Sequence, residues 1–261
     1  MTSWKTLFFK EFKASTLWLY LNLTVILLGG VSFILFNNTS MVLHSLMFII
    51  VFHIIYLPIW IVYSMFIEWK DRTITHWYSL PHSGIMLLTS KFMAGVAMML
   101  LSLLASSIVL TFLYTFFLGE TDPIIEQGSV WFIHNFWGVF LGIGFMAIYA
   151  GSQILCAIFL GASVTKFKPV WIIIFLLLPG FIQMWLQKIP FYEAATRWGM
   201  FTSPSEKWLE PLLRYDYDVF KSANILSEVT VFSIGVVGPQ LIISVLLVWV
   251  SSKLFDRYLQ I

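Results

Sequence analysis

Long apolar runs separated by short polar segments dominate the pattern of this 261-residue chain. A transmembrane helix needs about 20 consecutive, mostly apolar residues. Six stretches meet this requirement, and none carries Asp, Glu, Lys or Arg well inside it. They lie at about 15–36, 42–67, 92–118, 131–162, 169–187 and 229–252. The pattern therefore predicts an all-α membrane protein with six transmembrane helices.

The first 14 residues follow an amphipathic pattern instead. Apolar side chains recur at spacings of three and four, and lysines fall on the opposite side of the predicted helix. The apolar residues are Trp4, Leu7, Phe8 and Phe12, and the lysines are Lys5, Lys10 and Lys13. We expect residues 1–14 to form an interfacial helix, and residues 15–261 to form a single membrane domain. An ordinary basic tail is the alternative.

Composition supports the membrane class. Hydrophobic residues make up 59% of the chain and charged residues only 11%, whereas soluble domains carry about 45–50% apolar and about 25% charged residues. The formal net charge of +2 gives no indication of nucleic-acid binding. The single cysteine, Cys156, excludes an internal disulfide. The first apolar run is as long as a full span and no small-residue cleavage site follows it, so we expect a retained helix rather than a signal peptide.

Lysine and arginine predict the orientation, because these residues accumulate on the cytoplasmic side of membrane proteins. Ten of them fall in 1–14, 68–91, 163–168 and 253–261, and five fall in the long segment 188–228. The short connections 37–41 and 119–130 contain none. We therefore expect both chain ends in the cytoplasm and 188–228 outside, with the protein in the cytoplasmic membrane.

The usual sequence motifs for ATP binding and for zinc proteases are absent. The chain contains no G-x-x-x-x-G-K-[ST] loop for ATP and no H-E-x-x-H zinc motif. We therefore expect no catalytic residues, no metal and no cofactor in this chain. The segment 188–228 has acidic residues but no histidine or cysteine. A membrane enzyme or assembly factor with its site in that segment is the alternative function.

Polar side chains within the predicted spans include His44, His53, Gln153 and Gln183. Such residues usually hydrogen-bond a neighbouring helix. Contact with a transported molecule is the other interpretation, and it makes these four residues candidates for a translocation path.

The segment 68–91 mixes charges with apolar side chains that a solvated loop does not need, among them Trp77 and Tyr78. In this segment the chain resembles the permease subunits of ABC-2 type transporters, which also have six spans and an N-terminal interfacial "elbow" helix. Their first cytoplasmic loop typically has Glu, then Gly-Thr, then Leu-Pro-x-Ser, and a Lys that opens the third helix. The matching positions here are Glu68, Thr73, Leu80, Pro81, Ser83 and Lys91, and Arg72 replaces the usual Gly.

The resemblance implies that 68–83 is a coupling loop that docks on a separate cytoplasmic ATPase subunit. Its contact residues would be Glu68, Arg72, Thr73, Trp77, Tyr78, Leu80 and Pro81. ATP and Mg²⁺ would be bound by that partner, and a second permease chain, identical or related, would complete the transporter. The large outer segment is similar to that of Gram-positive exporters of amphipathic peptides, such as the phenol-soluble modulin exporters. The expected activity is export of hydrophobic or amphipathic cargo.

Overall fold

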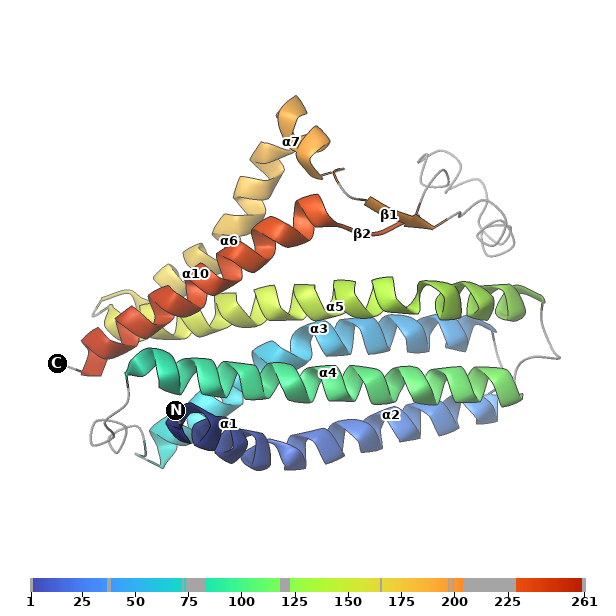
Figure 1. Cartoon of the computed structure of the whole chain (residues 1–261), viewed down its shortest axis with the longest axis horizontal. Helices are drawn as coiled ribbons and strands as arrows, with labels where there is room; N and C mark the ends of the chain where they lie inside the picture. The colour runs from blue at the N-terminus through green and yellow to red at the C-terminus, as the bar shows by residue number, and fades with distance from the viewer. Residues whose placement is uncertain are drawn as a thin grey trace.

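The computed structural model describes residues 2–36, 39–71, 73, 83–117, 123–164, 166–196, 198, 200–203 and 229–259. Within these residues the fold is helical apart from one short pair of strands (Figure 1). In chain order the elements are α1 (Thr2–Ala14), α2 (Thr16–Phe36), α3 (Thr39–Lys70), α4 (Gly84–Phe117), α5 (Pro123–Ser163), α6 (Lys168–Leu186), α7 (Pro190–Thr196), β1 (Met200–Ser203), β2 (Val229–Ser233) and α10 (Ile234–Leu259).

Five helical segments among the described residues are long and apolar enough to cross a membrane, as expected of a multi-pass membrane protein. They are Val51–Lys70, Gly84–Val109, Phe140–Ser163, Lys168–Leu186 and Ile234–Arg257. Within α2, the stretch Thr16–Leu28 qualifies only as a shorter apolar helix. A sixth span at α2 therefore stays a prediction. The predicted interfacial helix at 1–14 is confirmed as a helix, α1.

Three predicted boundaries were wrong. Helix α4 begins at Gly84 rather than near 92, so the connection from α3 is shorter than the predicted 68–91. Helix α5 begins at Pro123, inside the predicted loop 119–130, because proline fits the first turn of a helix, where its missing N–H costs nothing. Residues 229–233 form a strand instead of the start of the last helix, since the β-branched residues Val229, Thr230 and Val231 favour extended backbone.

Glycines allow α3 to pack closely between α4 and α5. A Cβ atom at Gly95 of α4 would lie 2.5 Å from the ring of Trp60, and one at Gly151 of α5 would lie 2.8 Å from Leu57. Trp60 and Leu57 of α3 are both buried. Small residues permit this close approach of membrane helices, where dispersion contacts rather than hydrophobic burial favour association. The core of the molecule lies among these three helices.

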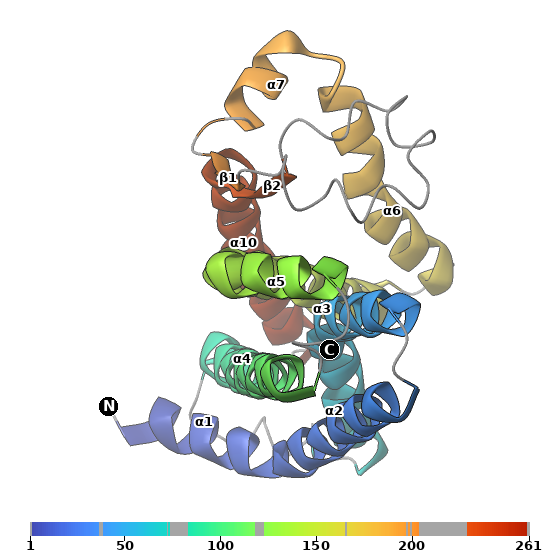
Figure 2. The same cartoon turned by 90° about the vertical axis from the view of Figure 1, so that its right-hand side faces the viewer.

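Helix α6 leans away from this bundle together with α7 (Figures 1 and 2). It packs on α5, where a Cβ atom at Gly161 would lie 2.5 Å from Ile172, yet none of its residues is buried. Strands β1 and β2 pair in antiparallel fashion near the start of α10. Helix α7 and strand β1 were not predicted.

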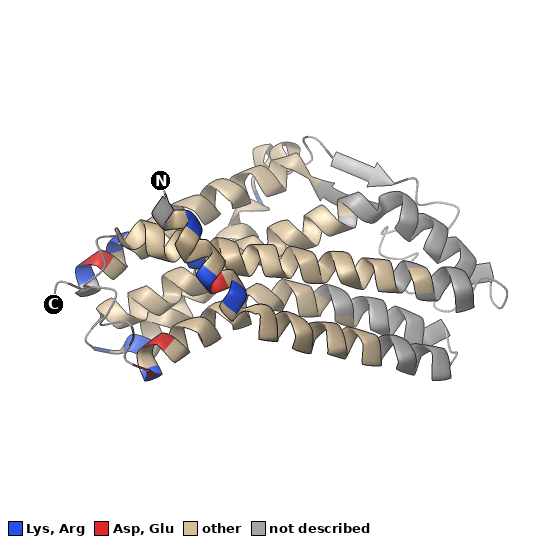
Figure 3. Cartoon of the chain, turned by 60° about the horizontal axis from the view of Figure 1, so that its bottom comes forward, with Lys and Arg blue, Asp and Glu red and all other residues tan. Residues whose placement is uncertain are grey.

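Both chain ends lie at the same end of the molecule as the α3–α4 connection (Figure 1). Most of the described charged residues gather toward that end, on α1, at the end of α3 and at the end of α10 (Figure 3). A membrane–water boundary at this level would leave the apolar lengths of the helices in the bilayer. The predicted topology stays a prediction, and the assignment of this end to the cytoplasm rests on the lysine and arginine distribution.

Candidate functional site

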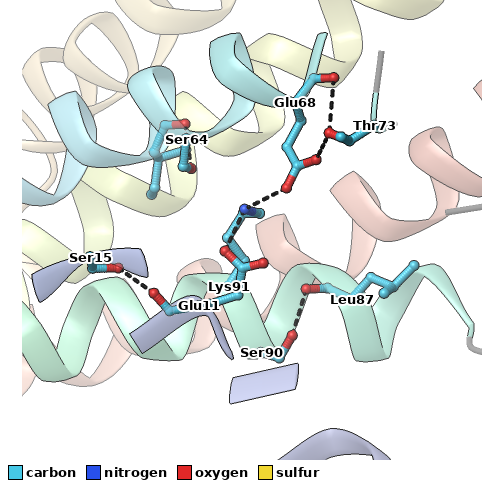
Figure 4. Close-up of polar contacts among 9 residues, drawn as sticks. Glu11, Ser15, Ser64, Glu68, Thr73, Leu87, Ser90 and Lys91 are labelled. Atoms are coloured by element: carbon cyan, nitrogen blue, oxygen red, sulfur yellow. Dashed lines mark hydrogen bonds and ion pairs between the residues drawn. The ribbon is translucent and has the colours of Figure 1, made fainter. Parts of the chain in front are cut away.

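A buried ion-pair cluster joins three helices at the charged end of the molecule. The Lys91 ammonium of α4 donates to Glu11 of α1 at 2.6 Å and to Glu68 of α3 at 3.3 Å. Figure 4 shows the ammonium between the two carboxylates. The Lys91 side chain is 4% exposed, and the two glutamates are 11% and 13% exposed. The sequence analysis placed Lys91 at the opening of the third span, and the structure buries this lysine about two turns into α4.

The same cluster fixes the start of the connection between α3 and α4. Thr73 donates its hydroxyl hydrogen bond to the carboxylate of Glu68 and also lies 3.3 Å from the Glu68 carbonyl oxygen. Glu68 therefore accepts from Thr73 on one side and from Lys91 on the other (Figure 4). Thr73, in the connection after α3, is thus linked to α4 through Glu68.

The far end of the connection is tied to α10. The backbone N–H of Gly84, at the first residue of α4, donates to the Asp256 carboxylate at 3.0 Å. This contact satisfies one of the free N–H groups of a helix N-terminus and places a negative charge at the positive end of the helix dipole. A Cβ atom at position 84 would lie 2.3 Å from that carboxylate oxygen, so a larger residue there would displace the Asp256 carboxylate.

Burial makes this cluster energetically sensitive. Moving charges out of water is costly, and the mutual attraction of the partners offsets that cost only while all of them are present. Loss of one partner typically costs about 3–5 kcal/mol because the remaining charge stays buried. The cluster therefore holds α1, α3 and α4 in one arrangement, and a change in that arrangement would have to move all three helices together.

Two of the seven predicted coupling residues, Glu68 and Thr73, are brought together by the structure. The other five lie outside the described residues: Arg72, Trp77, Tyr78, Leu80 and Pro81. Two anchoring residues were missed by the sequence analysis, Glu11 and Asp256. Glu11 lies three or four positions after Phe8 and Leu7, on the otherwise apolar side of α1, and this acidic interruption was the available signal. Nothing in the sequence indicated the pairing of Asp256 with Gly84, which is 172 positions away.

The predicted translocation residues are not gathered into one site. His53 is fully buried in α3. Gln153 is partly buried on α5, one turn after Tyr149, whose side chain it contacts. Gln183 is exposed on α6, and the side chain of His44 lies outside the described residues. The contacts of His53 are those of a residue that bonds neighbouring helices, which was the first of the two interpretations.

His53 is the centre of a second polar cluster, inside the bundle. Its Nε2 atom lies 3.0 Å from the Ser102 hydroxyl and 3.2 Å from the Ser106 hydroxyl of α4. Asn22 of α2 donates its amide to the same Ser102 hydroxyl. All four residues are buried. This cluster joins α2, α3 and α4 within the apolar part of the fold, and the sequence analysis identified only His53 among its members.

In the described part of the chain, no group of three or more His, Cys, Asp or Glu side chains could hold a metal ion. Comparisons of the sequence with protein-family models and with curated proteins, and of the structure with solved structures, found no match. The proposed function therefore rests on the residues and the geometry of the two clusters.

Proposed function

We propose that the chain is the membrane-spanning subunit of an ABC-2 type transporter. It exports hydrophobic or amphipathic cargo, most simply peptides, across the cytoplasmic membrane. A separate cytoplasmic subunit binds ATP and Mg²⁺ and hydrolyses the nucleotide, and a second permease chain completes the path. The loop pattern from Glu68 through Leu80-Pro81 to Lys91 supports the family, and one structural observation supports the mechanism.

That observation is the attachment of the α3–α4 connection at both of its ends. At its start, Thr73 and Glu68 are linked to Lys91 and through it to Glu11 of α1. At its end, Gly84 is linked to Asp256 of α10. A solvated loop has no need of such anchors, whereas a loop that transmits force must be connected to the elements that move.

The mechanism follows from these attachments. A partner that binds residues 74–82 and moves when it binds ATP would pull on both anchors. The displacement would pass into α3 and α4 directly, into α1 through Glu11 and into α10 through Asp256. Binding would favour one of two arrangements of the helices, as a population shift driven by the contacts made in the ATP-bound state. The aromatic pair Trp77 and Tyr78 has the residue types that dominate binding energy at protein interfaces.

The cargo class rests on the apolar character of the spans. No Asp, Glu, Lys or Arg lies near the middle of a predicted span, so an ion or a sugar phosphate would find no permanently charged partner there. Most exposed side chains of α6 are apolar, with the aromatic residues Trp171, Phe181 and Trp185 among them. Such surfaces suit molecules that partition into membranes.

The first test is purification of the detergent-solubilised chain from its native membrane, with mass spectrometry and an ATPase assay. We expect a stoichiometric P-loop ATPase that is lost from the Trp77→Ala/Tyr78→Ala variant. Trp198→Ala is the matched control, since this exposed aromatic residue lies next to α7, away from the charged end. Purification of the chain alone after gentle extraction would refute the proposal.

A second variant distinguishes the transmission of movement by the α3–α4 connection from the docking of the ATPase. Thr73→Val removes one hydrogen bond at the anchor and leaves the pair between Lys91 and Glu68 in place. We expect unchanged ATPase association and an export rate that falls by about 2–10-fold, the equivalent of a single hydrogen bond. Thr24→Val is the control, because the exposed Thr24 hydroxyl bonds only the carbonyl of Tyr20 in its own helix, at 2.9 Å. Normal export by Thr73→Val would exclude this anchor from coupling.

A further inference from the structure

We propose that the exposed face of α1 is a binding surface for the headgroups of anionic phospholipids in the leaflet at the charged end of the molecule. This surface consists of Lys5, Phe9, Lys10 and Lys13, and we call it the basic face. The proposal is independent of ATP-driven transport and concerns the lipid partner of the chain. It rests on the charge of the face, on its continuity with an apolar surface and on its fixed orientation.

The basic face carries positive charge only. Helix α1 contains one acidic residue, Glu11, and the fold turns this residue inward, where it is buried and paired with Lys91. The three lysines of the helix remain exposed. Pairing with Lys91 therefore removes the one negative charge from the surface of α1 and leaves three ammonium groups without an acidic neighbour on the same helix. A surface of this kind complements the negative potential of a leaflet that contains anionic lipid.

An apolar residue lies among these charges. The side chain of Phe9 is 64% exposed, between Lys5 and Lys13 on the same side of α1. A face in contact with the aqueous phase alone would gain nothing from an exposed phenyl ring. Interfacial helices characteristically place aromatic side chains at the acyl boundary while lysines extend to the headgroups.

The basic face continues into a surface that faces hydrocarbon. Helix α2 begins two residues after the end of α1, and Leu17, Tyr20 and Leu21 are all more than half exposed. These residues begin an apolar helix, so their exposed side lies in the bilayer. Lys13 precedes Leu17 by one turn and therefore lies at the boundary, at the level of lipid phosphates. This continuity favours a lipid partner over an acidic protein.

The orientation of the basic face is fixed by the opposite side of α1. Trp4 donates its indole N–H hydrogen bond to the hydroxyl of Thr89 of α4 at 3.2 Å. About two turns further along α1, Glu11 pairs with Lys91 of α4. Partly buried Leu7, Phe8 and Phe12 pack against the core between these contacts. The helix cannot rotate about its axis without breaking these contacts, so the lysines are held toward the lipid before any lipid binds.

The test compares lipid selectivity in the full chain and in Lys5→Gln/Lys10→Gln/Lys13→Gln. Each protein is reconstituted in nanodiscs of phosphatidylcholine with 1-palmitoyl-2-oleoyl-phosphatidylglycerol, and electron spin resonance of spin-labelled lipids gives the relative association constant of the two headgroups. We expect preference for phosphatidylglycerol in the unmodified chain, and its fall by up to about fivefold for each lysine removed. High salt should reduce the preference of the unmodified chain toward that of the variant.

The matched control is Lys166→Gln/Lys168→Gln/Lys253→Gln, which removes the same charge from exposed positions outside α1. A much smaller loss of preference in this control would support a site on α1. An equal loss in both variants would refute the site and indicate attraction by net charge alone. Unchanged lipid preference in the α1 variant, with loss of a co-purified protein, would also refute the proposal and assign the face to a protein partner.

Phe9→Ser separates the apolar contact from the charges. We expect this variant to keep the salt-dependent preference for phosphatidylglycerol, because its lysines are unchanged. Insertion of the face itself is measured with a fluorophore attached to a Phe9→Cys variant, since the native Cys156 is buried, and we expect lipids brominated near the headgroup to quench this fluorophore. A folding defect is excluded by unchanged elution from size-exclusion chromatography. Absence of quenching at position 9 would contradict insertion of the basic face into the interface.

Discussion

Helices α4 and α6 are similarly apolar, yet the structure places them in opposite environments. More than half of the α4 segment Gly84–Val109 is buried within the molecule, whereas no residue of α6 is. Both segments are long enough to cross a bilayer. Apolar character therefore predicts that a helix lies in the membrane, but it does not predict whether protein or lipid surrounds that helix.

The difference lies in the small residues. Helix α4 carries alanine, glycine and serine along the side that packs on its neighbours, and the buried members include Ser90, Ala94, Ser102, Ser106 and Ser107. In α6 the only glycine or alanine is Gly180, which has nothing within 4 Å of its Cβ position. Small side chains permit close helix packing in membranes, and large ones keep the helices apart. A helix built from Trp, Ile, Leu and Phe is suited to contact with lipid, or with a second chain.

The largest loss of stability is expected from removal of the buried charge of Lys91. Lys91→Met leaves Glu11 and Glu68 buried without a cation, and such a loss costs about 3–5 kcal/mol. We expect a much lower midpoint of thermal unfolding in detergent, measured by loss of the monodisperse peak in size-exclusion chromatography. Lys168→Met, at the exposed start of α6, should leave the midpoint unchanged. Equal stability of the two variants would show that the cluster does not hold the helices together.

Much of the fold could be predicted from the sequence because membrane helices are defined by length and apolar composition. The interfacial pattern of Trp4, Leu7, Phe8 and Phe12 correctly indicated α1, and long apolar runs correctly indicated α3 to α6. Helix ends were less accurate. The start of α4 at Gly84 depends on Asp256, a residue far along the chain, and local sequence does not carry that information.

The candidate site was predictable only in part, for the same reason. The family resemblance drew attention to Glu68 and Thr73, which meet in the structure. The ion pairs of Lys91 were not predicted, because a lysine near the end of a span usually extends toward water. Its burial depends on carboxylates from two other helices, and only the tertiary fold shows that Glu11 and Glu68 converge on it.

A smaller effect is expected from a single methyl group at a packed glycine. The Cβ atom of Gly95→Ala would lie 2.5 Å from Trp60, which is buried and has no room to move, and overpacking of this kind costs about 1–3 kcal/mol. Gly180→Ala on α6 meets nothing and adds helix propensity, so its unfolding midpoint should stay the same or rise. A lower unfolding midpoint for Gly95→Ala, with an unchanged or higher midpoint for Gly180→Ala, would confirm the contrast between the two helices. A stabilising Gly95→Ala would contradict it.

The smallest effect is expected at the polar residues inside the spans. His53→Ala removes the partner of two buried serine hydroxyls, and hydrogen bonds within membranes contribute about 0.6 kcal/mol on average, so the midpoint should fall only slightly. Gln183→Ala, on exposed α6, should leave it unchanged. Export of a fluorescent amphipathic peptide then separates the two interpretations of His53. A residue that only joins helices loses export in proportion to its loss of stability. Abolished export in a His53→Ala protein of nearly normal stability would instead place His53 on the translocation path, deep in the packed region rather than along the exposed surface of α6.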